Sequence, residues 1–347
     1  MPDLTRAIAA LSGGVDSALA AALLLEDGFA VEGVHLARES GAPAASDAAR
    51  VAAHLGIPFR VLDAAEDFGE LARWFCDEYA SGRTPSPCHR CNRIIKFKRL
   101  LALADDIGAG VVATGHYARL VRGNAGIRLF AAREERKDQS DFLSHLPPDA
   151  LARALFPLGE FTKDHVRAEA RRRGLPVADR PESQEICFIP NGDYAEFVGR
   201  VRPDAAREGP ILDDAGKRLG THGGIHRYTI GQRQGLGIAA GRPLCVIEIR
   251  PEENVLVVGP SDAAFRTTFT AAAMNWLAER PPTTRFRASV KIRHRHTAAP
   301  AFVTPLADGR IRVIFDGPQH AITPGQASVV YDGEEVVGGG WIESVER

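Results

Sequence analysis

Short apolar runs alternate with amphipathic helical patterns over the first third of the chain. The apolar runs predict strands at 6–11, 30–36, 59–63 and 111–114, and the helical patterns predict helices at 16–27, 46–55, 69–80 and 92–107. Strands that alternate with helices predict an α/β fold with a parallel sheet covered on both faces. Ligands of such sheets bind at the carboxyl ends of the strands, where Leu11 to Gly13 and Thr114 to His116 both fall.

The pattern changes after about Leu143. Helical stretches at 149–154 and 163–173 lead into an irregular run at 175–194, and short strands split by Gly and Pro follow from Gly209 onward, at 245–250, 254–259, 310–315, 327–333 and 334–341. This pattern predicts a β-rich region of one or two small barrels, with a boundary near Pro260 to Phe265. We therefore expect three domains: a catalytic domain at 1–200, a small central domain at 201–262 and a C-terminal β-barrel at 263–347.

Composition narrows the classes of protein that remain. A chain of 347 residues with 45% hydrophobic content buries more than one core, and a net charge of −1 confines any nucleic-acid binding to local basic surfaces. No apolar run is long enough to span a bilayer, and the apolar N-terminus has the features of a first strand rather than a secretory signal. We expect a cytoplasmic protein. The odd number of cysteines argues against a disulfide framework, and Cys76 and Cys245 have the surroundings of buried apolar residues.

The loop Ser12-Gly13-Gly14-Val15-Asp16-Ser17 joins the first strand to the first helix. Two glycines let the backbone approach a phosphate, the following helix presents free N–H groups, and the two serine hydroxyls add donors. Asp16 is a candidate Mg²⁺ ligand or loop-ordering residue. The loop lacks the Gly-Lys-Ser/Thr of a Walker motif. It resembles the loop of the ATP pyrophosphatases, which cleave ATP to AMP and pyrophosphate. That resemblance implies ATP contacts by Ala10, Leu11 and the loop.

The run Thr84 to Phe97 holds Cys88 and Cys91 after two prolines that enforce an extended approach. A helix predicted from Asn92 places Cys91 at a helix N-terminus, which favours its thiolate, with Arg90 and Arg93 adding positive charge. The alternative is half of a structural zinc site. Such a site needs a second pair of ligands, and Cys187 is the one further thiol in a comparable setting.

Six motifs in order make the chain similar to the tRNA-specific 2-thiouridylase family. They are TPSPCHRCNRIIKF at 84–97, ATGHY at 113–117, KDQS at 137–140, ICFI at 186–189, YTIGQRQGLG at 228–237 and PGQ at 324–326. The resemblance implies that ATP adenylates O2 of the wobble uridine and that sulfur then replaces this oxygen. It implies further that Cys187 carries a persulfide from a sulfur-relay or cysteine desulfurase protein. Cys91 matches the nucleophile, and the two cysteines end the cycle as a disulfide.

The chain departs from the family pattern at Cys88, where many members have Asp, and at Ser86, where many have Asn. Asp141 stands where Tyr is usual, and the loop after Leu36 is short. The extra thiol leaves a second route open, in which Cys88, Cys91 and Cys187 hold a [4Fe–4S] cluster that binds sulfide. We favour the persulfide relay.

The resemblance also implies nucleotide and tRNA contacts. Leu36 and Gly115 match positions that flank the adenine and ribose, and the matched tRNA contacts are Ser86, Pro87, Cys88, His116, Lys137, Asp138, Gln139, Arg293, His294, Arg295 and Gln326. The expected substrates are wobble-uridine tRNAs for Lys, Glu and Gln. Independently, alternation at 285–296 predicts a strand whose open face carries a phosphate-binding stripe of Arg285, Arg287, Lys291, Arg293 and Arg295.

Two other functions remain open at this level. One is an ATP pyrophosphatase that amidates or ligates a small molecule, which would give Cys91 and Cys187 no role. The other is a non-catalytic RNA-binding protein with a structural metal at the Cys88–Cys91 pair, which would bind RNA without releasing pyrophosphate.

Overall fold

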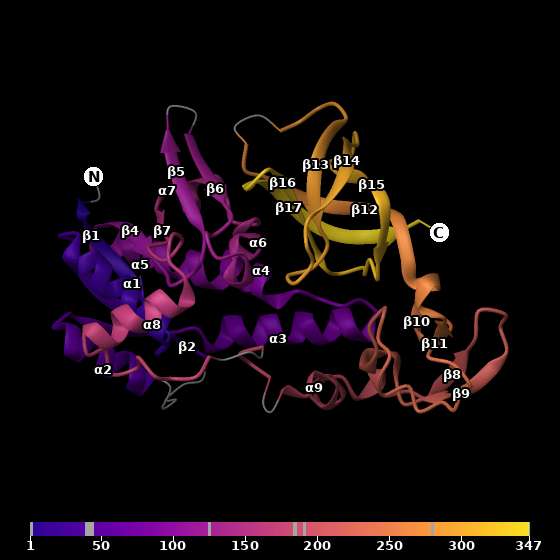
Figure 1. The fold of residues 1–347 in the computed structure, drawn as a ribbon. Helices are drawn as coiled ribbons and strands as arrows, with labels where there is room; N and C mark the ends of the chain where they lie inside the picture. The colour runs from indigo at the N-terminus through magenta and orange to yellow at the C-terminus, as the bar shows by residue number, and fades with distance from the viewer. Residues whose placement is uncertain are drawn as a thin grey trace.

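A computed structural model describes residues 3–38, 45–123, 126–182, 186–189, 192–278 and 281–346 of the chain. Figure 1 shows an α/β body on one side and two β-rich bodies on the other, with the long helix α3 (Ala65–Ala80) running from the first toward the others. The short loop after Leu36 falls mainly at 39–44, outside the described residues.

The first body is built on a five-stranded parallel sheet. Its order is β3 (Phe59–Asp63), β2 (Ala30–Ala37), β1 (Asp3–Ala10), β4 (Ala109–Ala113) and β7 (Ala154–Leu155). One face packs against α1 (Val15–Glu26), α2 (Ala45–Leu55) and α8 (Lys163–Arg172), and the other against α5 (Phe97–Ile107). In β1, Ala7 and Ala9 join the first core and Ile8 joins the second, as alternation in a strand requires. The predicted two-faced parallel sheet is confirmed.

The strand order reverses its direction of growth at β1, between β2 and β4. In an open α/β sheet this switch point opens a crevice at the carboxyl ends of the strands. The loop after β1 and the segment after β4 meet at this crevice, so the fold brings the phosphate loop and Gly115 together.

Two local predictions are wrong. The helix expected from Asn92 begins five residues earlier, because Pro87 fits the first turn of α4 (Pro87–Cys91), which continues through a π-helical segment (Asn92–Lys96) into α5. The helix expected at 149–154 is α7 (Pro148–Ala152), and the chain then enters β7.

Several further elements of the first body carry no clear sequence signal. They are the hairpin β5 (Arg119–Gly123) and β6 (Gly126–Phe130), α6 (Ser140–Leu143), α9 (Tyr194–Val201) and the 3₁₀ turns Glu135–Lys137 and Pro203–Ala205. Helix α9 packs against α3 through a shared aromatic core that contains Phe75, Tyr79 and Phe197.

The central body is a small four-stranded sheet. Its order is β10 (Cys245–Arg250), β11 (Val255–Gly259), β8 (Gly209–Leu212) and β9 (Arg218–His222), with 3₁₀ turns at Ile225–Arg227 and Ser261–Ala264. Cys245 is fully buried here, as Cys76 is in α3, which confirms the prediction that both are buried.

The C-terminal body is a closed six-stranded barrel, as predicted. Its strands are β12 (Phe265–Trp276), β15 (Ile311–His320), β14 (Ala299–Pro305), β13 (Phe286–Lys291), β16 (Ala327–Asp332) and β17 (Glu335–Val345). Pairing of β12 with β17 closes the barrel. Strand β17 also pairs with β6, so the hairpin of the first body extends the barrel sheet and joins the two. Among the described helices, none has the length and apolar character that a membrane crossing needs.

Candidate active site

The phosphate loop is held open by its own hydroxyls. Ser17 Oγ donates to the Gly14 carbonyl (3.0 Å) and lies 3.1 Å from Ser12 Oγ, and the Ser12 amide donates to Ser17 Oγ (3.2 Å). Gly13 has φ +81°, a conformation that favours glycine. No side chain caps α1 at Gly14, so the first amides of the helix face the crevice as an anion site. Leu11 and Val15 are buried in the core, and the Leu11 amide donates to the Val34 carbonyl (2.8 Å), which anchors the start of the loop to β2.

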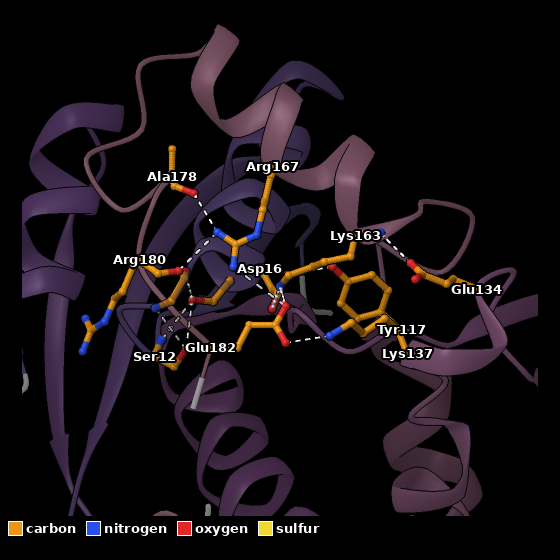
Figure 2. Close-up of polar contacts among 12 residues, drawn as sticks. Ser12, Asp16, Tyr117, Glu134, Lys137, Lys163, Arg167, Ala178, Arg180 and Glu182 are labelled. Atoms are coloured by element: carbon orange, nitrogen blue, oxygen red, sulfur yellow. Dashed lines mark hydrogen bonds and ion pairs between the residues drawn. The ribbon is translucent and has the colours of Figure 1, made fainter. Parts of the chain in front are cut away.

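The Asp16 carboxylate is paired within the protein and is not a free metal ligand. Lys163 Nζ donates to both of its carboxylate oxygens (2.7 and 2.8 Å), and the Tyr117 hydroxyl donates to Oδ1 (2.7 Å), as Figure 2 shows. The loop-ordering role is therefore the one that the structure supports for Asp16. The sequence offered no lysine in the loop, but α8 supplies one from 147 residues away.

Gly115 lies directly against the start of α1. A Cβ at this position would stand 2.7 Å from the Ser17 amide nitrogen and 2.8 Å from the Asp16 carbonyl carbon, which are backbone atoms that cannot move aside. Leu36, at the end of β2, packs between the apolar cluster of α5 and that of α3. Both residues thus lie at the carboxyl edge of the sheet, where the nucleotide was predicted.

An apolar cluster brings the distant cysteines together. Cys91 and Phe188, the neighbour of Cys187, pack against the same group of Ala64, Phe68, Leu71 and Ile95. All five cysteines are free thiols, and Cys88 and Cys187 are exposed. Burial is the largest cause of the raised pKa of Cys88 and Cys91, and a negative charge on Cys187 adds to the rise, so the three thiols lie within electrostatic reach of one another.

The predicted position of Cys91 at a helix N-terminus is wrong. Because the helix begins at Pro87, Cys91 ends α4 instead of starting a helix, and it gains little from the helix dipole. Burial raises the pKa of Cys91, and Lys96 offsets only part of this rise. Burial likewise raises the pKa of Cys88 to about 12, although its side chain reaches solvent, so this thiol lies recessed among protein atoms. At neutral pH both are protonated.

Lys96 links the thiols to the nucleotide crevice. Its Nζ lies 3.5 Å from His116 Nε2, and its charge lowers the pKa of Cys88 and Cys91 against the effect of burial. His116 is buried, with Nδ1 2.7 Å from Thr114 Oγ1, and burial together with Lys96 holds its pKa well below the ordinary value. A neutral His116 between the two sites can bind a base or ribose without adding charge. Sequence reasoning missed Lys96, although its motif was recognised.

Two of the predicted tRNA contacts in the KDQS segment serve the protein itself. Asp138 is buried and accepts hydrogen bonds from the amides of Ala132 and Ser140, which explains why an acid follows Lys137. Gln139 Oε1 accepts from the Tyr117 amide (3.1 Å). Lys137 is ion-paired with Glu182 (2.6 Å).

At the Cys88 end, the predicted contacts lie where the barrel touches the first body. Ser86 Oγ lies 2.8 Å from His89 Nδ1, and Pro87 opens α4. From the barrel, Gln326 Nε2 donates to the Thr84 carbonyl (3.0 Å), so the barrel supports the segment that leads into Cys88. His294 stacks on Phe142 and binds Asp141 through Nδ1 (3.0 Å).

The strand predicted at 285–296 is shorter than expected, so its five cations do not share one strand face. Strand β13 ends at Lys291, before Arg293 and Arg295. Arg287 forms two 2.6 Å hydrogen bonds with Asp316, and both Arg285 and Arg287 lie over the Phe302 ring. Lys291 is near Asp138 and Asp141, and Arg293 donates to the His320 carbonyl (3.0 Å), whereas Arg295 is exposed. Most of these cations contact other groups of the protein, and phosphate binding by them stays a prediction.

The described residues contain no group of three His, Cys, Asp or Glu side chains placed to hold a metal ion.

Comparison with known proteins covers nearly the whole chain. Residues 5–191 match the family model described as tRNA methyl transferase HUP domain, residues 195–260 the tRNA methyl transferase PRC-barrel domain, and residues 266–342 the aminomethyltransferase β-barrel domain. The tRNA-specific 2-thiouridylase MnmA of Chloroflexus aurantiacus is 45% identical over 357 residues, covering 99% of both chains. The protein of the same name from Acidithiobacillus ferrooxidans is 43% identical, covering 98% of this chain and 99% of its own.

Among solved structures, the NH3-dependent NAD synthetase of Campylobacter jejuni aligns with a TM-score of 0.33 and 20% identity. The alignment covers 50% of this chain and 66% of that one.

Proposed function

The chain belongs to the family of tRNA-specific 2-thiouridylases, and on that premise we propose how its own residues carry out the thiolation. The observation that carries the proposal is that Cys91 and Phe188, the neighbour of Cys187, pack on the same apolar cluster as Leu36 at the carboxyl edge of the sheet. Although two of the matching family models have names that refer to methyl transfer, a thiol pair beside a phosphate loop suits sulfur transfer.

The first step activates the uridine. O2 of the wobble uridine attacks the α-phosphorus of ATP, the bond to pyrophosphate breaks, and N3 of the base gives up its proton. The loop Ser12–Ser17 holds the departing pyrophosphate with its amides and hydroxyls. Leu36, Gly115 and neutral His116 then border the adenosine and the base. The oxygen at C2 has become part of AMP, which is a good leaving group.

The second step transfers sulfur. A donor protein loads Cys187, which is exposed and reachable, with a persulfide. The terminal sulfur attacks C2, and AMP leaves with the electrons of the C–O bond. Cys91 then attacks the Cys187 sulfur, so the S–S bond breaks toward the base, C2 keeps a thione and N3 regains a proton. Two thiols are oxidised to a disulfide as the sulfane sulfur is reduced, and a dithiol reductant must reopen the disulfide.

Lys96 is the group that helps these thiols to ionise. Burial favours the protonated forms of Cys91 and Cys88 at rest, and the nearby ammonium favours the thiolate once a substrate has arrived. Cys88 remains a third thiol, next to the persulfide. We favour the persulfide relay and derive no step through a cluster. Mg²⁺ would enter with ATP, since Asp16 is already paired with Lys163.

The remaining partners follow from this chemistry. We propose that residues 1–200 act on ATP and the base, and that residues 263–347 hold the tRNA through Arg295 and the barrel edge near Gln326. Residues 201–262 would connect these two domains. The substrates would be wobble-uridine tRNAs for Lys, Glu and Gln, and the donor a sulfur-relay or cysteine desulfurase protein. Substrate and reductant would both be met in the cytoplasm.

Mass spectrometry of tRNA from cells that lack this protein tests the function. Loss of 2-thiouridine at the wobble position, restored by the gene in trans, is expected. Unchanged 2-thiouridine in the deletion strain would reject the proposal.

A further inference from the structure

Three cationic side chains converge beside the phosphate loop. Lys163 Nζ lies against Asp16 and is almost buried, with 8% of its side chain exposed; Lys137 and Arg167 approach from the 3₁₀ turn and from α8. Figure 2 shows them next to Ser12 and the start of α1. Asp16 neutralises one of the three charges, so the cluster retains an excess of positive charge that an anion must balance.

In this structure the balancing anion is a carboxylate of the chain itself. Glu182 Oε2 accepts from Lys137 Nζ (2.6 Å), and Oε1 lies 3.0 Å from Lys163 Nζ and 3.9 Å from Arg167 Nη2. Burial alone would raise the pKa of Glu182, but the hydrogen bonds from Lys137 and Lys163 hold it below its ordinary value, so the group is ionised at neutral pH.

Glu182 is not built into the core in the way that Asp138 is. Its side chain is 30% exposed, and its oxygens are bonded to long, rotatable lysine and arginine side chains rather than to backbone amides. Asp138, by contrast, is 7% exposed and receives two backbone amide bonds. A carboxylate held by side chains at the surface can be exchanged for another anion at small structural cost.

We propose that the cluster of Lys163, Lys137 and Arg167 binds the β- and γ-phosphates of ATP. Glu182 is then an internal competitor for this site, which the polyphosphate displaces. The inference rests on the proposed function only in that ATP is the substrate. Polyphosphate carries several negative charges where Glu182 carries one, and it can bind the lysines and the free amides of α1 at once. Lys163 thereby supplies from α8 the positive charge that the loop lacks.

Calorimetry with pyrophosphate, ATP and AMP in magnesium-containing buffer, without tRNA or sulfur donor, tests the competition. Glu182→Gln removes the competing charge and should raise the affinity for pyrophosphate and ATP by about 5- to 30-fold. The reason is that a larger fraction of the molecules then has the three cations free to bind phosphate. AMP has no β-phosphate and should bind as before. Lys163→Met should weaken pyrophosphate and ATP by at least about tenfold.

Asp179→Asn is the matched control. Asp179 lies in the same segment and pairs with Arg171 of α8 (2.8 Å). The substitution removes the same charge as Glu182→Gln, but away from the cation cluster, so this variant should bind pyrophosphate and ATP with wild-type affinity. Glu182→Ala, with melting curves for each variant, guards against a folding effect of the glutamine. Unchanged or weaker pyrophosphate binding in folded Glu182→Gln and Glu182→Ala would overturn the proposal, since Glu182 would then support the site. A failure of tRNA thiolation alone would leave the competition standing and reject only the function.

Discussion

Protonated thiols in a thiol-transfer site are the most consequential feature at the scale of single residues. Cys88 and Cys91 sit where burial outweighs the ammonium of Lys96, so the pKa of each lies above the ordinary value. A raised pKa means that the neutral form dominates below it and that the reactive thiolate appears as pH rises. The site therefore gains nucleophiles only when substrate changes their surroundings.

Alkylation measures this directly. In the nucleotide-free protein, iodoacetamide should modify Cys88 and Cys91 at least about tenfold more slowly than free cysteine at pH 7.5, with rates that keep rising above pH 9. Peptide mass spectrometry resolves each site, and buried Cys76 and Cys245 serve as unreactive internal controls. A rate that has already levelled off by pH 7 would show a stabilised thiolate and contradict the assignment.

At the scale of elements, the sheet positions the nucleotide loop through one close contact between the end of β4 and the start of α1. The strand and helix pattern predicted this crevice, because periodicity reports which faces are buried. It could not predict the roles of Lys163 and Glu182, since nothing local shows that Lys163 meets Asp16, 147 residues away, or that Glu182 meets Lys137, 45 residues away. Nor could it place the helix start at Pro87, because proline suits both an extended segment and a first helical turn.

Gly115→Ala tests the close contact. Its methyl group would meet the Asp16 and Ser17 backbone, push α1 away from the strand, and lower ATP affinity at least about tenfold, with a stability loss of about 1–3 kcal/mol. Gly123→Ala, in β5, adds the same atom where nothing lies within 4 Å and should change neither quantity. Equal ATP affinity in the two variants would show that Gly115 does not shape the loop.

At the scale of the whole molecule, the barrel acts as a support for the cysteine helix. Strand β17 pairs with β6, Asn275 Nδ2 donates to the carbonyls of Ser144 and Leu146, and Gln326 holds the Thr84 carbonyl. From the sequence we predicted a barrel that acts as a separate RNA-binding domain. These contacts join residues far apart in the chain, so pattern analysis had no means of finding them.

Gln326→Leu should therefore slow thiolation by roughly 3- to 30-fold without changing ATP affinity, because it loosens the segment before Cys88 and leaves the phosphate loop intact. Gln319→Leu is the control, since that amide bonds within the barrel to the Gly317 carbonyl. Single-turnover rates and ATP calorimetry report the two effects. Equal thiolation rates of the Gln326→Leu and Gln319→Leu enzymes would show that this barrel contact does not affect the reaction.

The cations of the barrel should differ in how much each contributes to tRNA binding. Arg295 is exposed, so Arg295→Ala should weaken tRNA binding and reduce the slope of log affinity against log salt by about 1. Arg287 is paired with Asp316, and Arg287→Ala should leave that slope nearly unchanged. Equal slopes for the two variants, measured by filter binding over a salt series, would restore the continuous stripe that the alternation predicted.

The central claim is that ATP activation and sulfur transfer are separate steps that meet at Cys91 and Cys187. Purified wild-type protein, Cys91→Ser and Cys187→Ser can be given tRNA, ATP and a persulfide donor, and both pyrophosphate and the wobble nucleoside followed. Both variants should release pyrophosphate upon adenylating the tRNA and form no 2-thiouridine, whereas the wild type forms both products. Full 2-thiouridine formation by Cys187→Ser would contradict the account.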